Sequence, residues 1–172
     1  MERNASTDLT STSVIVLGLI ERCEEATPYE LKAMAARSVG NFWSVPHSAL
    51  YAEPERLARA GYLAQRRERG GRRRVSYSLT DAGRGALEAW RGDPAAEPPE
   101  LRDPALLKVF FGADPAAVAE SQVEAHRRKL VAYEQVKAGD DGSGNRGPWL
   151  ALEAGIRHER EWIEYWQELA KG

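Results

Sequence analysis

Two adjacent glycines near the middle of the chain place the strongest limit on how it can fold. Gly70–Gly71 separates two short runs within Ala64–Thr80, and paired glycines supply the positive φ angles that a tight hairpin turn requires. The second run alternates Val75, Tyr77 and Leu79 with two serines, which is the period of a strand with one buried face. The segment therefore predicts a β-hairpin that packs its apolar side against a core.

The same segment is strongly basic, with six arginines and one glutamate. The arginines are Arg66, Arg67, Arg69, Arg72, Arg73 and Arg74. Arginine runs most often form a solvated surface, but repulsion among them at a hairpin tip is also relieved beside a polyanion. Residues 1–90 hold 13 basic and 11 acidic residues, whereas residues 91–172 hold 11 and 15. A nucleic-acid surface is therefore expected only in the first half.

The first two of the three helices predicted before this hairpin show clear sequence signals. An apolar pattern starts at Val14 and predicts a first helix that ends near Glu25. The second helix opens with Thr27 as its N-cap, Pro28 at the first helical position and Glu30 three residues after the cap. This spacing is a capping box, because each end of it satisfies a backbone N–H group that the helix leaves without a partner.

A turn and a third helix follow. Gly and Asn within Ser38–Trp43 predict the turn, and we expect Phe42 and Trp43 to fill the gap between helices. The third helix is predicted to open at Ser44 and to close at Gly61. The order of three helices and a basic hairpin is that of a winged helix-turn-helix, in which the third helix enters the major groove and the hairpin touches the neighbouring backbone or the minor groove.

This arrangement predicts a set of DNA-contacting side chains. Those on the third helix can reach base edges or phosphates, and those on the hairpin can reach phosphates. The set is Ser44, His47, Ser48, Tyr51 and Arg56 on the helix and Arg72, Arg73 and Arg74 on the hairpin. Tyr51 is expected to place its hydroxyl at a phosphate rather than to read a base.

The remaining sequence predicts a second, helical domain. A fourth helix, capped by Thr80, runs to Trp90, and residues 91–104 hold four of the nine prolines, as an extended linker would. The prediction is thus a mainly α (α+β) protein. Its parts are a winged helix-turn-helix domain at 1–90, a linker at 91–104 and a helical dimerisation domain at 105–172.

Three helices are predicted in the second domain, at Ala105–Phe111, from Asp114 onward and at Pro148–Ala170. The last is too rich in aromatic side chains to leave them exposed. We therefore expect a homodimer through these helices, in which the third helix of each copy binds one half-site of a palindromic operator. The aromatic side chains are either interface core or the wall of a pocket for a planar, hydrophobic effector. They are Trp149, Trp162, Tyr165 and Trp166.

Several other classes of protein are not indicated. The longest apolar run, Val14–Ile20, is too short to cross a bilayer, and Met1–Ser13 lacks the pattern of a signal peptide, which predicts a cytoplasmic protein. A lone cysteine, Cys23, forms no internal disulfide and is expected to be buried. The run His126–Lys129 is expected to be solvated. No catalytic residue, metal ligand set or cofactor motif is found.

The chain resembles the PadR family of transcriptional regulators. The resemblance rests on Tyr51–Leu57, Gly61–Leu63 and Gly71–Gly83, and in the tail on Leu107–Gly112, Gln122–Leu130 and Gly155–Trp166. It implies a dimeric repressor, often released by a small molecule, with DNA contacts at His47, Ser48, Tyr51, Arg72, Arg73 and Arg74.

One residue departs from the pattern of the family. Many members have a helix former where Pro54 stands, so a kink is expected near Glu53 that would re-aim the first half of the third helix. A competing hypothesis keeps the winged helix only as a scaffold and docks a partner protein through the C-terminal aromatic residues.

Overall fold

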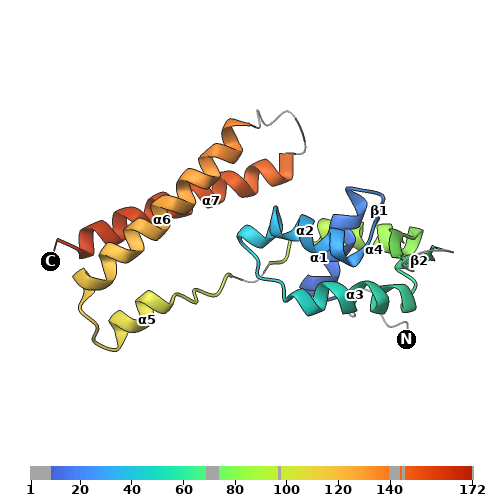
Figure 1. The fold of residues 1–172 in the computed structure, drawn as a ribbon, viewed down its shortest axis with the longest axis horizontal. Coiled ribbons are helices and arrows are strands. Elements are labelled where there is room, and N and C mark those ends of the chain that lie inside the picture. The colour runs from blue at the N-terminus through green and yellow to red at the C-terminus, as the bar shows by residue number, and fades with distance from the viewer. Residues whose placement is uncertain (1–8, 69–73, 97, 140–143, 145, 172) are drawn as a thin grey trace. The chain divides into compact units, whose positions relative to one another are not determined.

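The computed structural model describes residues 9–68, 74–96, 98–139, 144 and 146–171. The chain divides into two units between Glu97 and Pro98, which lie within the segment predicted as a linker. The first is a winged unit and the second is a helical unit (Figure 1). The fold is mainly helical with one small three-stranded sheet, which confirms the predicted fold class.

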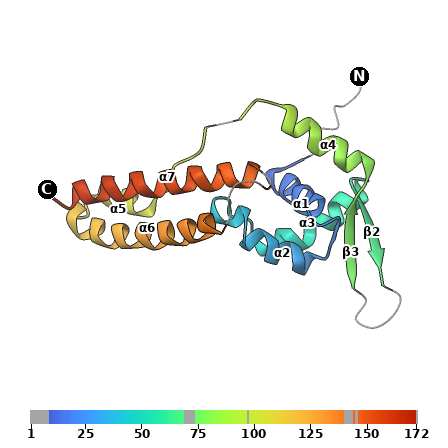
Figure 2. The same ribbon diagram turned by 90° about the horizontal axis from the view of Figure 1, so that it is seen from above.

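The winged unit has the predicted order of helices and strands. Its elements are α1 (Ser11–Glu21), β1 (Glu25–Ala26), α2 (Pro28–Ala36), the short 3-10 helix η2 (Val39–Asn41), α3 (His47–Arg59), β2 (Leu63–Arg67), β3 (Val75–Leu79) and α4 (Asp81–Gly92). Figure 2 shows β2 and β3 side by side as a hairpin that extends beyond the helices of this unit. The glycine turn between them lies outside the described residues.

The sheet has the order β1-β3-β2, with both pairs antiparallel. Tyr77 and Leu79 are buried and Val75 is half-buried, so the predicted inward face of the second strand is confirmed. Strand β1 was not predicted, because two residues carry no periodicity and their pairing partner lies about fifty residues later. Glu25 of β1 pairs with Ser78 of β3.

The first two helices follow their predicted caps. Thr27 and Glu30 form the capping box: the Thr27 backbone N–H donates to Glu30 Oε2 at 2.8 Å, and the Glu30 N–H donates to Thr27 Oγ1 at 3.3 Å. Helix α1 ends at Glu21, earlier than predicted, because the chain turns at Glu24, with a φ of 65°, to enter β1.

Three expectations about burial were wrong. Cys23 is exposed, because α1 has already ended two residues before it. Phe42 and Trp43 are exposed in the described structure rather than packed between helices. The helices instead meet through smaller side chains, with Leu17, Leu31 and Leu57 fully buried at the centre of the winged unit.

A glycine at the start of α4 explains why this helix can pack against the hairpin. A Cβ atom at Gly83 would lie 2.1 Å from the backbone oxygen of Tyr62, far inside van der Waals contact. Thr80, which caps α4, donates from its hydroxyl to the same oxygen at 3.0 Å. Gly83 therefore permits a close contact between α4 and the backbone of Tyr62 that any other residue would prevent.

The helical unit consists of α5 (Pro104–Phe110), α6 (Pro115–Ala138) and α7 (Arg146–Leu169). Helices α6 and α7 lie side by side along their length, and α5 packs at one end of the pair (Figures 1 and 2). Trp166 is fully buried in a cluster with Ala105, Ala119 and Val123. The single chain thus buries this tryptophan without a partner, so the expectation that it needs a second copy was wrong.

Candidate nucleic-acid interface

Helix α3 presents a polar face to solvent. His47, Ser48 and Tyr51 are exposed, while Leu50 and Leu57 of the same helix are buried. This amphipathic division is what holds the helix on the core and turns its other side outward. The helix begins at His47, so Ser44 lies before it and not on it, contrary to the predicted start.

Pro54 does not end the helix. Helix α3 is continuous from His47 to Arg59, with Pro54 buried on the side that faces the core. A proline there cannot donate a backbone hydrogen bond to Leu50. The ring instead adds apolar surface to the core, so the helix keeps its exposed face despite the missing hydrogen bond.

Arg56 points toward α1 and not outward. Its guanidinium donates to both carboxylate oxygens of Glu53, at 2.7 and 3.0 Å, and to Ser13 Oγ at 2.9 Å. The fully buried Ser13 donates in turn to Glu53 at 2.5 Å. Partial burial alone would raise the pKa of Glu53, but these hydrogen bonds outweigh it and hold the pKa below its ordinary value. This network ties α3 to α1, and DNA contact by Arg56 stays a prediction.

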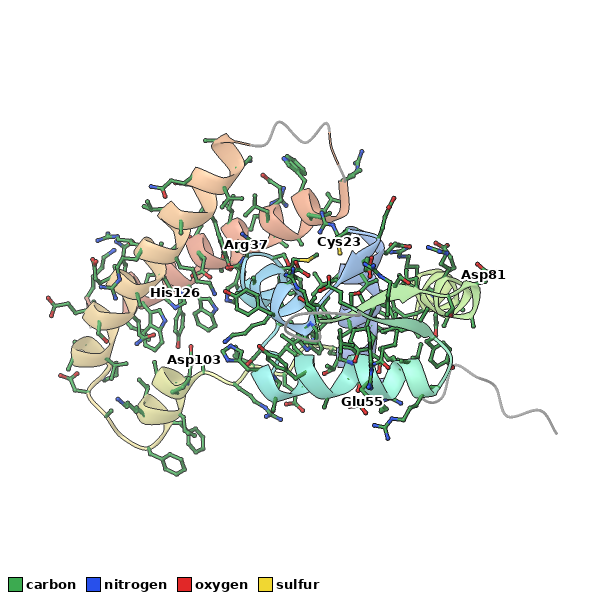
Figure 3. The ribbon with its side chains drawn as sticks, turned by 45° about the vertical axis from the view of Figure 1, so that its right-hand side comes forward. Cys23, Arg37, Glu55, Asp81, Asp103 and His126 are labelled. Carbon is green, nitrogen blue, oxygen red and sulfur yellow. The ribbon has the colours of Figure 1, made fainter. Side chains whose placement is uncertain are left out.

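The exposed face of α3 holds one acidic residue that sequence reasoning missed. Glu55, which is labelled on α3 in Figure 3, is exposed one turn after Tyr51. Its helical spacing of i+4 from Tyr51 could have identified it. A carboxylate here can accept a hydrogen bond from a cytosine amino group, so Glu55 is a candidate for base readout.

Near the turn end of the hairpin, two described arginines have carboxylate partners. Arg74 donates from Nη2 to Glu30 Oε1 at 3.2 Å, and Arg66 donates to Glu25 through Nε and Nη2 at 2.8 and 2.9 Å. The predicted contacts Arg72 and Arg73 lie outside the described residues. All four of these paired side chains are at least one-third exposed, so solvent weakens both ion pairs.

A hollow lies where α2, α3 and the hairpin meet. Its lining includes Tyr29 at the start of α2, Tyr51 of α3, and Glu68 and Arg74 at the two ends of the hairpin strands. Tyr29 and Tyr51 are both exposed. The winged unit thus brings Tyr51 and Arg74, two of the predicted DNA contacts, to one surface feature.

The predicted effector residues lie in two places in the helical unit. Trp162, Tyr165 and Trp166 form an aromatic cluster, with ring centroids 5.3 to 6.3 Å apart. Trp149 lies elsewhere, 5.5 Å from the Lys137 ammonium. The Trp166 indole N–H is buried and has no hydrogen-bond partner among the described residues. Trp166 is fully buried and so cannot contact a partner protein, whereas Tyr165 is 37% exposed, and docking of a partner through the C-terminal aromatic residues stays a hypothesis.

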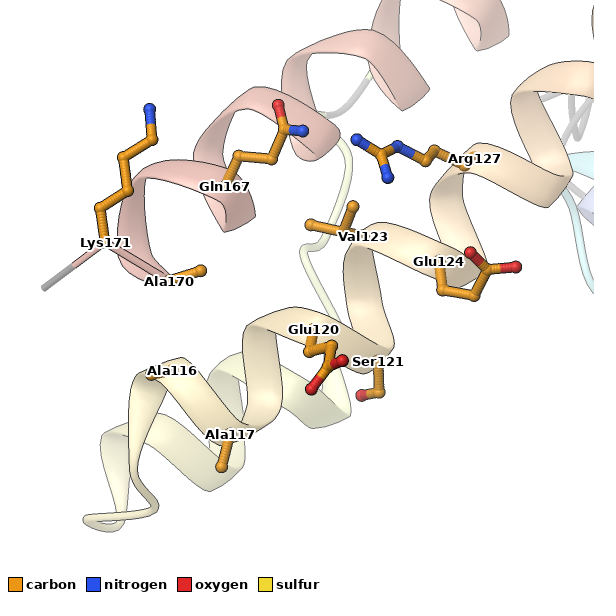
Figure 4. A pocket seen from close by; sticks show the side chains of 10 residues that line it. All are labelled: Ala116, Ala117, Glu120, Ser121, Val123, Glu124, Arg127, Gln167, Ala170 and Lys171. Atoms are coloured by element: carbon orange, nitrogen blue, oxygen red, sulfur yellow. The ribbon is translucent and has the colours of Figure 1, made fainter.

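A groove between the ends of α6 and α7 does not include these aromatic residues. It is lined by small and charged side chains, among them Ala116, Arg127, Gln167 and Lys171 (Figure 4). Such a lining lacks the flat apolar walls expected of a site for a planar ligand. The predicted effector residues and the groove are therefore separate features.

A buried carboxylate joins α6 to α7 beside the aromatic cluster. Glu159 is 1% exposed and bonds His126 Nδ1 at 2.5 Å, with Lys129 Nζ at 3.3 Å. His126, labelled in Figure 3, comes from α6 and stacks on Trp162. Burial would lower the pKa of Lys129, but the charge of Glu159 and contact with Tyr133 raise it above its ordinary value. The expectation that His126–Lys129 is a solvated face was wrong for His126, whose side chain is 18% exposed, whereas Lys129 is exposed.

Two other kinds of site are not indicated by the described residues. Within the described ranges, no group of three or more His, Cys, Asp or Glu residues could hold a metal ion. No helix among the described residues is both long and apolar enough to cross a bilayer.

Comparisons with known proteins agree with the geometry of both units. Residues 16–89 match the transcriptional regulator PadR-like family, and residues 101–171 match the family described as virulence activator alpha C-term. The negative transcriptional regulator PadR of Bacillus subtilis is 24% identical over 169 residues, which cover 90% of this chain and 92% of that protein.

Solved structures show the same fold. The B. subtilis PadR structure in complex with operator DNA has a TM-score of 0.82 at 22% identity, covering 94% of this chain and 98% of that chain. The structure of the same protein with p-coumaric acid has a TM-score of 0.76 at 22% identity, covering 92% and 96%. This family consists of regulators and not of enzymes. The chain therefore belongs to the PadR-like family of DNA-binding transcriptional regulators.

Proposed function

We propose that this regulator is a homodimeric, sequence-specific repressor that binds a palindromic operator. In the proposal, α3 enters the major groove through His47, Ser48 and Tyr51, and the hairpin places Arg74 on the backbone. The observation that carries it is the polar face of α3 beside the basic hairpin. The similar B. subtilis protein, a negative regulator by name and solved with operator DNA, supports repression and duplex binding. We also propose that the protein is cytoplasmic, because its DNA target lies in the cytoplasm.

Base readout can be tested by substitution on α3. Ser48→Ala should change the preference for one base pair in the operator by about 1 to 3 kcal/mol, because a hydroxyl that contacts a base edge discriminates by that amount. Binding of single-base operator variants to wild type and Ser48→Ala measures the change. Ser121→Ala, an exposed serine on α6, is the control. Uniform weakening on every operator variant would contradict base readout by Ser48.

The proposed dimer needs an exposed apolar surface, and α5 supplies one. Phe110 and its neighbour Phe111 are 80% and 77% exposed, and Leu107 is exposed beside them. Each buried phenylalanine removes about 150 to 250 Å² from water, so this patch can form the centre of an interface of about 800 Å² per copy. We assign the dimer contact to these residues in place of Trp166.

Molar mass in solution tests the dimer. The double change Phe110→Ser with Phe111→Ser should convert a dimer into a monomer in sedimentation velocity at micromolar concentration. Trp90→Ser, which changes an exposed aromatic residue of the winged unit, should leave the dimer intact. A monomeric wild type, or a double variant that stays dimeric, would contradict the assignment.

We also propose a planar, phenolic or hydrophobic effector, bound at the aromatic cluster of the helical unit. The partly exposed Trp162 and the exposed Tyr165 support this, as does the p-coumaric acid complex of the B. subtilis relative. Titration of phenolic acids should quench tryptophan fluorescence and weaken operator binding. Trp162→Phe should reduce the quenching, whereas Trp90→Phe should not. Absence of both effects across a broad panel would count against an effector.

A further inference from the structure

Two acidic residues of the winged unit make different contacts with two of the three described hairpin arginines, Arg66 and Arg74. Glu25 accepts two hydrogen bonds from Arg66, through Nε and Nη2, and a third from the Ser76 hydroxyl. The sheet register explains this grouping, because Arg66 lies opposite Ser76 and Glu25 lies opposite Ser78 on the same face. One whole edge of the Arg66 guanidinium is therefore bound to a carboxylate within the protein.

This pairing leaves Arg66 with little attraction for a phosphate. A bidentate arginine–carboxylate pair is nearly neutral at a distance, and a phosphate would have to compete with both of its hydrogen bonds. The hydrogen bonds from Arg66 and Ser76 also hold the pKa of Glu25 below its ordinary value, so the carboxylate stays charged near neutral pH.

Arg74 is held differently. Among the described residues the one hydrogen bond of its side chain runs from Nη2 to Glu30 Oε1, so further N–H donors of the guanidinium can serve a ligand. Glu30 is itself fixed, because its other oxygen accepts from both the backbone N–H and the hydroxyl of Thr27 at 2.8 Å. The cap of α2 therefore anchors the side chain that holds Arg74 at the hollow.

The hollow offers further donors to an anion. Tyr29 and Tyr51 line it with Arg74, and both tyrosines are exposed. Glu68 lines it too and would repel a free anion. A phosphate of a duplex meets the same repulsion, but the contacts of the duplex with α3 can offset it, whereas a free phosphate ion has no such contacts.

We propose that Glu25 and Glu30 give two of the hairpin arginines different roles. Glu25 neutralises Arg66, whereas Glu30 positions Arg74 to bind one backbone phosphate of duplex DNA in the hollow. This inference rests on the proposed DNA-binding function. Glu30 acts as a positioning residue and Arg74 as the contact.

A matched pair of variants tests whether Arg74 and Arg66 contribute differently to DNA binding. Arg74→Gln should weaken binding to native and scrambled duplexes alike by about tenfold, as expected for one lost charged contact, and should reduce the slope of log K against log salt by about 0.9. The double change Arg66→Gln with Glu25→Gln, which removes the whole neutral pair from the same hairpin, should change both affinities by less than about twofold. Equal losses for the two variants would overturn the proposal.

The carboxylates provide the second test. Glu25→Gln should release Arg66, strengthen binding to both duplexes and steepen the salt slope, and an unchanged slope would overturn its role.

Glu30→Gln keeps an amide oxygen for the helix cap and should weaken binding in the wild type but not in an Arg74→Gln background. A further loss in that background would contradict positioning through Arg74. If wild type binds native and scrambled duplexes equally while Arg74 and Arg66 still differ, only the proposed sequence specificity fails.

Discussion

Replacing the buried carboxylate of the helical unit should destabilise that unit by a predictable amount. In Glu159→Gln the shape is kept and the charge is lost. A hydrogen bond to an ionised group contributes about 1.5 to 3 kcal/mol and a neutral one about 1 kcal/mol, so the bond to His126 should weaken by about 1 kcal/mol. Lys129 is 48% exposed, so its lost attraction adds only about 0.5 kcal/mol. The expected loss in the free energy of unfolding is therefore about 1.5 kcal/mol.

Thermal unfolding followed by tryptophan fluorescence measures this change, because Trp149, Trp162 and Trp166 report on the helical unit. For a chain of this size the loss corresponds to a Tm lower by about 3 to 6 °C. Glu161→Gln, an exposed carboxylate on the same helix, is the control and should stay within about 0.5 kcal/mol of wild type. A Glu159→Gln variant as stable as this control would refute the reasoning, since the buried contacts would then contribute nothing.

Other predictions concern the winged unit. Gly83→Ala should destabilise it by at least about 2 kcal/mol in urea unfolding, since its Cβ meets the Tyr62 oxygen. Gly85→Ala, in the same helix with nothing within 4 Å of its Cβ, should stabilise it by about 0.5 to 1 kcal/mol; equal effects would contradict this account. Because the folded-state pKa of Glu53 is lowered, its carboxylate stabilises the fold above the ordinary value of 4.5, and this is lost as pH falls through the folded-state pKa. Glu53→Gln should therefore be less stable than wild type at pH 7 and approach it in urea titrations near pH 3; a constant gap would contradict the lowered pKa.

Local signals in the sequence predicted most of the fold. Capping residues such as Thr27 and Thr80 and the alternation around Tyr77 each act through near neighbours, and the elements they predict are present. The ends of two helices, α1 and α3, were predicted wrongly. The start of α3 at His47 rather than Ser44 depends on how the preceding turn packs, which local preference does not determine.

Contacts between distant residues could not be predicted. The Arg56 network needs Ser13, 43 residues earlier, and the buried Glu159 meets His126 from another helix. A run such as His126–Lys129 looks solvated in sequence because nothing near it indicates a buried acid 33 residues later. For the same reason, Arg66 and Arg74 look equivalent in sequence, although the structure pairs them with different carboxylates.

The most direct test of the proposed function is fluorescence anisotropy of the purified protein on duplex DNA from upstream of its own gene. A scrambled duplex of equal length and composition is the control, and both are measured over a range of salt concentrations. We predict binding about a thousandfold tighter to the native duplex at physiological salt, with a steep negative dependence on salt. Weak and equal binding to the two duplexes would contradict sequence-specific recognition at this site.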